Sequence, residues 1–376
     1  MRPPSRLASA FKEDLSDMSR TISWRTAALA ALLLSSGIAA APPALAQTRT
    51  VSDTNAPLVH DRALVIPNVP VGPFSDSLAL DLDGQRLFAT PQAAKSVAVI
   101  DLRTGAVSRM LSGIGNPHGI VYDNDHLFVS DGASDEVKVF DGKTFTSVKS
   151  IRVAEGADMA SFDPVNHIFY VNSSGGTALG KSTVTAIDTR KMEAAWTVEV
   201  ETAGIEGSAI DPQRQLLYVT MRDKGAIGVI DLKTRRVIGT WKMPATDVLP
   251  WAVAIDPARQ RLFVACREAV VETGMRGAMV VLDAQSGKVM ERMPVGGWAD
   301  GIHYDAKRQL VHVSSGLGRV ESFAADAKAG VRRLGSTETD LMGKASLFSP
   351  ELDRLFVSLP RLGAKPAQVV VLKPSR

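Results

Sequence analysis

The stretch DPQRQLLYVTMRDKGAIGVIDLKTRRVIGT, residues 211–240, contains an Asp-Pro turn, an apolar run, a polar loop and a second apolar run that ends in Ile-Asp. A third run, RRVIGTWKM, follows at residues 235–243. The same order of runs returns about every forty-odd residues along the chain. Self-similarity at a fixed period of this length is the signature of a repeat protein. The repeated unit therefore decides the architecture.

The repeats align on the acidic residue that ends the first apolar run of each unit. Successive markers are 42, 40, 48, 45, 49 and 44 residues apart, and they fall at Asp81, Asp123, Asp163, Asp211, Asp256, Asp305 and, in the seventh unit, Ser349. An aromatic residue follows seven positions later in most units, at Phe88, Tyr170, Tyr218, Phe263 and Phe356, and the second unit reaches Phe128 after a shorter turn. The chain thus contains seven copies.

Each copy holds four short apolar runs, which are typical of the strands of a propeller blade. We therefore predict an all-β fold, a seven-bladed β-propeller of four-stranded blades. The seventh copy stops at its third strand, QVVVLKPSR, whereas an unassigned strand, RALVIPNV at residues 62–69, precedes the first copy. Pairing the two would remove both open strand edges, which are otherwise prone to aggregate. We expect this N-terminal strand to close the ring.

Residues 1–46 have the features of a secretory signal peptide. Arg20 and Arg25 precede an apolar stretch at residues 27–41, and an Ala-Leu-Ala site ends at Ala46. The stretch is short for a membrane-spanning helix, so we expect cleavage; a retained anchor helix is the alternative. A start at Met18 would give a more typical charged region than Met1. The predicted organisation is a signal peptide at 1–46, a flexible segment at 47–58 and the propeller at 59–376.

Composition agrees with an exported globular protein. The 376 residues are 45% hydrophobic and 22% charged, which excludes disorder and a collagen-like chain. Removing residues 1–46 lowers the 43 basic and 40 acidic residues to 38 and 37, so net charge gives no argument for nucleic acid. Cys266 is the single cysteine and cannot form an intramolecular disulfide. We expect a periplasmic or secreted monomer with no membrane span in the mature chain.

The repeat resembles that of the YVTN-repeat (YncE-like) β-propeller family. Its YVTN-like strand appears as LFATP, LFVSD, FYVNS, LYVTM, LFVAC, VHVSS and LFVSL, and its VIDxxT strand appears in VIDLKT. The resemblance covers residue 64 to the C-terminus. It implies the propeller fold and a binding module, because such proteins share no catalytic motif.

The residue five positions before each marker should lie at the mouth of the central channel. These seven mouth positions hold Asp76, His118, Asp158, Glu206, Trp251, Asp300 and Lys344. Four of the seven are carboxylates, and like charges this close raise one another's pKa unless a cation intervenes. The mouth is therefore a hydrated opening without a ligand, a ring neutralised by Lys344 and nearby Arg side chains, or a site for a divalent, Ca-like cation.

A second stretch, ADGIHYDAKRQLVHVSSGLGRV at residues 299–320, is similar to the gluconolactonase/senescence-marker family of metal-dependent propeller hydrolases. The resemblance implies a metal ligand at Asp300 and another at Asp76, where the family's first-blade glutamate would lie. The family's asparagine ligand midway round the ring is not matched, since Asp158 and Glu206 stand there. The predicted metal ligands are Asp76, Glu206 and Asp300, with His118 or Asp158 as the catalytic candidate that handles the proton.

The other candidates have structural explanations beside the functional ones. His312 occupies the position of the repeated aromatic residue in its unit and is expected in the core. We expect His303 to pack inside an innermost strand. His126 and His167 are expected in solvated turns. Cys266 is expected to be a buried hydrophobe. Arg222 and Arg267, in loops at the mouth, could grip a carboxylate or phosphate, and a solvated charged loop is the alternative.

Two main functions compete. The first is a binding or scaffold protein that uses the charged channel mouth, including Trp251, Lys344, Arg222 and Arg267, to hold a small molecule or a protein segment. The second is a divalent-metal-dependent hydrolase or lactonase. Single-stranded nucleic-acid binding ranks last, because it needs a basic groove with stacked aromatics and Trp251 is the one aromatic among the mouth positions.

Overall fold

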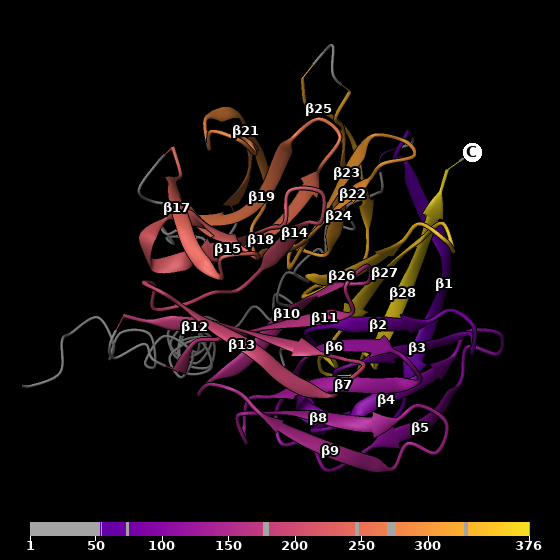
Figure 1. The fold of residues 1–376 in the computed structure, drawn as a ribbon. Coiled ribbons are helices and arrows are strands. Elements are labelled where there is room, and N and C mark those ends of the chain that lie inside the picture. The colour runs from indigo at the N-terminus through magenta and orange to yellow at the C-terminus, as the bar shows by residue number, and fades with distance from the viewer. Residues whose placement is uncertain are drawn as a thin grey trace, which may run out of the picture. The chain divides into compact units, whose positions relative to one another are not determined.

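The computed structural model describes residue 53 and residues 55–72, 75–175, 180–244, 248–268, 276–326 and 330–375. These residues form seven antiparallel four-stranded sheets, as Figure 1 shows. The expected all-β, seven-bladed propeller is confirmed. The signal peptide predicted at residues 1–46 lies outside the described residues. In the part of the chain that is described, no helix has the length and apolar character to cross a membrane.

In six blades the four strands follow one another in the sequence, with the first strand innermost and the fourth outermost. Blades one and two contain β2 (Leu78–Asp81), β3 (Arg86–Ala89), β4 (Val97–Asp101), β5 (Val107–Leu111), β6 (Pro117–Asp123), β7 (His126–Asp131), β8 (Glu136–Asp141) and β9 (Ser147–Arg152). Blades three and four contain β10 (Ala157–Asp163), β11 (Ile168–Ser173), β12 (Ser182–Asp188), β13 (Glu193–Val200), β14 (Ser208–Asp211), β15 (Leu216–Met221), β16 (Ala226–Asp231) and β17 (Arg236–Lys242). Blades five and six contain β18 (Val248–Asp256), β19 (Arg261–Glu268), β20 (Arg276–Asp283), β21 (Val289–Gly296), β22 (Ala299–Asp305), β23 (Leu310–Ser315), β24 (Arg319–Ala324) and β25 (Arg332–Glu338).

The seventh blade joins the two ends of the sequence. It consists of β26 (Ala345–Ser349), β27 (Arg354–Leu359), β28 (Ala367–Pro374) and, outermost, β1 (Leu58–Ile66). Strand β1 pairs with β28 from Leu58↔Pro374 to Ile66↔Ala367, so the N-terminal strand closes the ring as expected. It begins four residues before the predicted start at 62. The segment ahead of it is held at Asp53, whose backbone N–H donates to the carbonyl of Ser336 at 3.0 Å.

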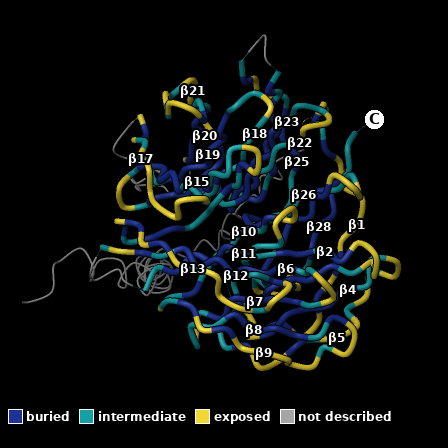
Figure 2. Tube along the Cα trace, in the orientation of Figure 1, coloured by how far each residue is buried: buried dark blue, intermediate teal, exposed yellow. Residues whose placement is uncertain are grey.

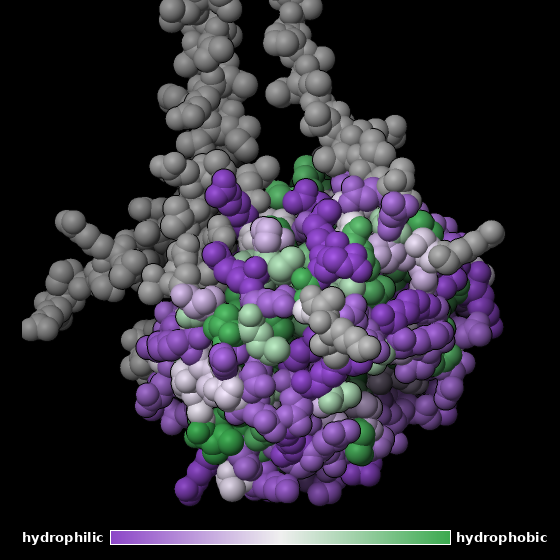
Figure 3. Space-filling view, turned by 90° about the horizontal axis from the view of Figure 1, so that it is seen from above, coloured by the Kyte–Doolittle hydropathy of each residue, from purple (hydrophilic) through white to green (hydrophobic). Residues whose placement is uncertain are grey.

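The innermost strands contact their neighbours in the order β2, β6, β10, β14, β18, β22, β26 and back to β2, which makes a closed cycle. Burial follows from this arrangement. The second and third strands of the blades are largely buried, whereas outer strands such as β9 are mostly exposed (Figure 2). On the face drawn in Figure 3, apolar side chains occur in small groups among hydrophilic ones. Most of the described surface seen there is hydrophilic.

The repeated aspartate has a local structural reason. In the fourth blade, Oδ1 of Asp211 accepts hydrogen bonds from the backbone N–H groups of Gln213 and Arg214, both at 3.1 Å. Such an Asx turn lets a short side chain satisfy the backbone at the end of a strand. Gln215 then adopts a left-handed conformation with φ of 58° before the next strand begins. The marker therefore fixes the turn between the first two strands of a blade.

The repeated aromatic residue fills the space between blades. Phe88, Phe128, Tyr170, Tyr218, Phe263 and Phe356 are each at most 3% exposed. His312, which takes this slot in the sixth blade, is 1% exposed, which confirms its core assignment. Complete burial of a side chain of this size stabilises a fold by roughly 1.5–3 kcal/mol. Each of these six aromatic residues belongs to a larger buried apolar cluster that joins two neighbouring blades.

Candidate functional site

The mouth positions lie at the start of the innermost strands, and a distortion of the sheet sets several of them apart. In four blades the pairing between the first and second strands shifts at this point, and the mouth residue falls within the irregularity: His118, Asp158, Trp251 and Asp300. A β-bulge leaves its extra residue outside the ladder and re-aims the side chain. These four side chains therefore do not follow the regular alternation of a β-strand.

His118 connects two of the carboxylates. Its Nδ1 lies 2.8 Å from Oδ2 of Asp76 and 3.1 Å from Oδ1 of Asp158, residues that belong to the first and third blades. These three residues bring one imidazole nitrogen and two carboxylate oxygens within 4.8 Å of one another. We call Asp76, His118 and Asp158 the acidic cluster.

Two amides flank the acidic cluster. Nε2 of Gln92, from the 3₁₀ turn Gln92–Ala94, donates to Oδ2 of Asp76 at 2.6 Å and lies 2.9 Å from Nδ1 of His118. The side-chain amide of Asn116 lies 2.7 Å from Nε2 of His118. Asp131 holds the Asn116 backbone N–H at 2.8 Å. Both ring nitrogens of the histidine therefore have polar neighbours.

The remaining mouth carboxylates are paired with basic side chains. Glu206 pairs with Arg222. Asp300 accepts two hydrogen bonds from Arg267, at 2.8 and 2.6 Å, and a third from Nζ of Lys344 at 2.6 Å. The bonds of Asp300 link the fifth, sixth and seventh blades, whereas the Glu206–Arg222 pair lies within the fourth. We call Glu206, Arg222, Arg267, Asp300 and Lys344 the basic cluster.

Two tryptophans enclose the guanidinium of the basic cluster. Cζ of Arg267 lies 3.3 Å from the ring centroid of Trp251 and 4.7 Å from that of Trp298. Arg222 lies over Trp251 at 5.4 Å. A guanidinium over an indole face gains cation–π attraction, so stacking and the bidentate bonds to Asp300 both fix Arg267.

The electrostatics of the mouth shift several pKa values. Burial raises the pKa of Asp158, and the charge of Asp76 raises it further. Burial also raises the pKa of Glu206, to about 7, with a further contribution from Asp158. Burial would lower the pKa of His118, but its hydrogen bond to Asp76 and the charge of Asp158 outweigh that effect and raise it. Strongly perturbed groups that converge in one place mark a candidate functional site.

The structure divides the residues predicted as metal ligands. Asp76 joins His118 and Asp158, whereas Glu206 and Asp300 lie in the basic cluster with arginine and lysine partners. Both oxygens of Asp300 accept hydrogen bonds from Arg267 or Lys344, and Oε1 of Glu206 accepts one from Arg222, so cations neutralise these two carboxylates. Metal binding by Asp76, Glu206 and Asp300 together stays a prediction, and the geometry brings a different set together.

Three mouth residues escaped the sequence analysis: Gln92, Asn116 and Trp298. Asn116 and Trp298 each lie two residues before a mouth position, and Gln92 lies in a loop between the second and third strands. Looking at a single offset from the marker could not find them. A search of the whole loop before each innermost strand would have included Asn116 and Trp298.

The other histidines and Cys266 lie away from this chemistry. Nε2 of His303 lies 2.9 Å from Oγ of Ser346, and burial lowers its pKa to about 4. His167, expected to be solvated, instead bonds to Asp123 at 2.9 Å, and His126 bonds to the carbonyl of Asn124. Cys266 is fully buried, as expected, and burial raises the pKa of its thiol.

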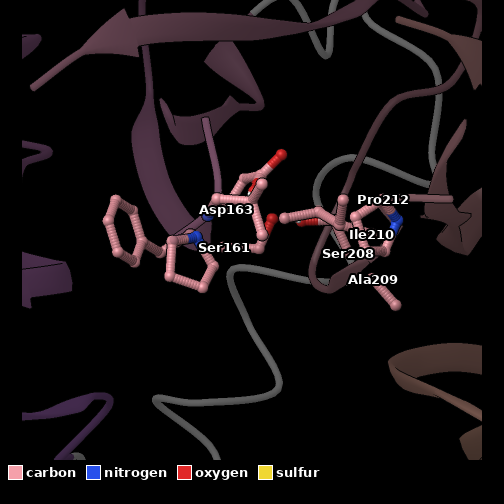
Figure 4. A pocket seen from close by; sticks show the side chains of 9 residues that line it. Ser161, Asp163, Ser208, Ala209, Ile210 and Pro212 are labelled. Carbon is pink, nitrogen blue, oxygen red and sulfur yellow. Dashed lines mark hydrogen bonds between the residues drawn. The ribbon is translucent and has the colours of Figure 1, made fainter. Parts of the chain in front are cut away.

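A shallow pocket of about 280 Å³ lies between the third and fourth blades, around the marker ends of β10 and β14 (Figure 4). Ser161, Asp163, Ser208 and Pro212 are among its lining residues, and Ser208 donates to Ser161 at 2.9 Å. The lining includes none of the mouth residues. This pocket is therefore separate from the charged site.

Comparisons with known proteins support the fold. No protein-family model and no curated protein sequence matches the chain. Among solved structures, a chain of Kuenenia stuttgartiensis hydrazine synthase aligns with a TM-score of 0.67 at 19% identity, over 78% of this chain and 95% of that chain. At this identity the likeness shows a shared fold alone.

Proposed function

We propose that the chain is an exported binding protein that holds a small polar ligand at the mouth of its channel. The propeller supplies a rigid frame, and its closed ring brings side chains from all seven blades to one place. Rigid support lowers the entropic cost of binding, because the contacting groups are already positioned. The same architecture accommodates a protein segment, which is the second form of this proposal.

One observation carries the proposal: the acidic cluster and the basic cluster lie on different blades around the mouth. The first three blades contribute Asp76, His118 and Asp158, and the fourth to seventh contribute the basic cluster with Arg222, Arg267 and Lys344. A ligand with an anionic group at one end and a cationic or hydrogen-bonding group at the other would complement both clusters. Amino acids and related zwitterions have this distribution of charge.

A metal-dependent hydrolase is the second candidate. The acidic cluster favours it, since three donor atoms lie together beside groups with raised pKa values. Against it, the asparagine ligand of the gluconolactonase resemblance has no counterpart here. Nucleic-acid binding receives no support from the mouth, because its two tryptophans contact Arg267.

Thermal denaturation in the presence of defined probes tests the binding proposal. Zwitterionic amino acids, succinate and phosphate would be added separately to the purified mature chain. A ligand that binds the folded state alone raises the melting temperature by mass action. We expect the zwitterions to give the largest shift, and isothermal titration calorimetry would confirm it.

The variant Arg267→Gln removes the bidentate donor and its stacking, so the shift should be lost relative to the variant's own ligand-free melting temperature. Arg103→Gln is the matched control, because Arg103 forms an exposed ion pair with Asp101 at the edge of the first blade. An equal shift in wild type and Arg267→Gln, or no shift with any probe, would refute binding at this mouth.

A further inference from the structure

We propose that Asp76, His118 and Asp158 form a binding site for a divalent transition-metal ion of the zinc type. This inference goes beyond the binding proposal, which gives the acidic cluster only the contact with the cationic or hydrogen-bonding end of a ligand. It also differs from the Ca-like site on Asp76, Glu206 and Asp300 expected from the sequence. Four features of the structure carry it.

The first is the spacing of the donor atoms. Nδ1 of His118 lies 2.8 Å from Oδ2 of Asp76 and 3.1 Å from Oδ1 of Asp158. Zinc bonds to nitrogen and oxygen are about 2.0–2.2 Å long. Two ligands around such an ion are therefore separated by about 2.8–3.6 Å in octahedral or tetrahedral geometry. The two distances from His118 match this separation, and all three donor atoms lie within 4.8 Å of one another. Metal binding would require the amide of Gln92 to turn away, because its Nε2 lies 2.6 Å from Oδ2 of Asp76 and 2.9 Å from Nδ1 of His118.

The second is the chemistry of the donor set. One imidazole nitrogen and two carboxylate oxygens are borderline ligands that suit zinc and its neighbours in the transition series. Ca²⁺ prefers six to eight oxygen ligands at 2.3–2.6 Å. Two carboxylates also balance the charge of a divalent ion. The cluster thus matches zinc in ligand type and in charge.

The third is that, in the described part of the chain, neither Asp76 nor Asp158 forms an ion pair with arginine or lysine. Among the residues that the structure describes, the ion-pair partner of both Asp76 and Asp158 is His118, whereas Glu206 and Asp300 bond to arginine or lysine. A carboxylate without an arginine or lysine partner keeps its negative charge for a metal ion. The mouth therefore separates the carboxylates that could bind a metal from those that are already neutralised.

The fourth is the support of the imidazole. Metal-binding histidines place their other ring nitrogen against a fixed polar partner, which sets the tautomer and the ring orientation. The amide of Asn116 occupies this position, 2.7 Å from Nε2, and its oxygen and nitrogen can exchange places by rotation of the amide. Asp131 anchors the Asn116 backbone, and a Cβ at Gly132 would lie 3.1 Å from the same Nε2. The ring is held with Nδ1 toward the two carboxylates.

The test uses the purified mature propeller, stripped with a chelator and titrated with zinc against a competing chromophoric chelator. We expect one zinc ion per chain. Replacing zinc by Co²⁺ should give visible d–d absorption, which reports nitrogen and oxygen ligands in a low-symmetry site. Asn116→Ala should weaken zinc binding about 10–100-fold, the usual effect of losing a residue that supports a metal ligand.

The variants Asp158→Asn and His118→Gln should abolish stoichiometric binding. Glu206→Gln and Asp300→Asn are the matched controls and should keep it, because they remove mouth carboxylates of the basic cluster. Circular dichroism and melting curves establish that each variant is folded. If His118→Gln does not fold, Asp158→Asn and the Co²⁺ spectrum of the wild type decide the question.

Three results would overturn the proposal: no stoichiometric zinc in the wild type, equal affinity in Asp158→Asn, or loss of binding in Asp300→Asn but not in Asp158→Asn. The last would return the site to the residues expected from the sequence. The zwitterion experiment has its own variant, Arg267→Gln, so failure of the metal site and failure of ligand binding can be distinguished.

Discussion

His312 and Ser322 form a polar pair where the other blades have an apolar one. The two residues face each other across β23 and β24, with Nδ1 of His312 2.9 Å from Oγ of Ser322. The equivalent pairs are Phe88↔Val99, Phe128↔Val139, Tyr170↔Ala186, Tyr218↔Val229, Phe263↔Val281 and Phe356↔Val371. The double variant His312→Phe/Ser322→Val would therefore restore the pairing of the other blades. We expect it to remove part of the acid sensitivity of the fold.

The expected size of the effect follows from the pKa of His312. Burial lowers this pKa from 6.5 to about 4, and the side chain is 1% exposed. Above pH 6.5 the imidazole is neutral in the folded and unfolded states and contributes no pH dependence. Between pH 6.5 and 4 the unfolded chain binds a proton that the folded chain does not, so stability falls. The loss is about 1.4 kcal/mol at pH 5.5 and about 3 kcal/mol at pH 4, as an order of magnitude.

Urea denaturation at several pH values between 7.5 and 5 measures this difference. The free energy of unfolding of the wild type should fall relative to the double variant by about 1.4 kcal/mol between pH 7.5 and 5.5. Ionisation of the other groups is common to both proteins and cancels in the comparison. A constant difference between the two proteins across this range would refute the reasoning, because it would mean that His312 accepts its proton within the fold.

Three further predictions concern the stability of the propeller and the cleavage of the predicted signal peptide. Arg261→Met should lower the free energy of unfolding by about 3 kcal/mol, because it removes the buried partner of Asp256 and leaves the more distant Arg259 at 3.7 Å. Arg103→Met at an exposed pair should cost under about 1 kcal/mol; similar costs in urea titrations would contradict this. A chain that begins at residue 69 lacks β1 and should melt lower and scatter more light than a chain that begins at residue 52; identical melting would show that β1 does not stabilise the ring. N-terminal sequencing of the exported protein should begin at Gln47, and a mature chain that retains residues 29–34 would rule out cleavage.

The fold could be predicted because its determinants repeat. Five of the marker aspartates, Asp81, Asp163, Asp211, Asp256 and Asp305, accept a hydrogen bond from the backbone of the turn that follows. In six blades an aromatic residue five or seven positions after the marker fills the space between blades, so local chemistry and global packing impose the same period. The limits of β1 were harder to predict. Its start at Leu58 depends on pairing with Pro374, a contact between distant parts of the chain that no local pattern encodes.

The candidate site could be predicted in part for a related reason. Equivalent positions in a closed ring converge on one axis, so a single offset from the marker found the mouth residues. Their partners could not be predicted in this way. Gln92 and Arg222 come from 3₁₀ turns that follow the second strand of their blades, where length and conformation differ from copy to copy. Arg267, expected in a loop, lies in β19 near the end of the second strand of its blade. These side chains decide which carboxylates are neutralised and which remain available.

The closure of the ring by β1 also determines how the fold responds to mechanical force. Strands β1 and β28 are antiparallel, and the backbone N–H of Ser375 donates to the carbonyl of Pro57 at 2.8 Å, so the outer ends of both strands lie side by side. Pulling residues 57 and 375 apart would load the backbone pairs one after another rather than all at once. Each such hydrogen bond contributes only about 0.5–1.5 kcal/mol net. A closure that protects both edges against heat and denaturant would therefore unzip under a small tension along this line.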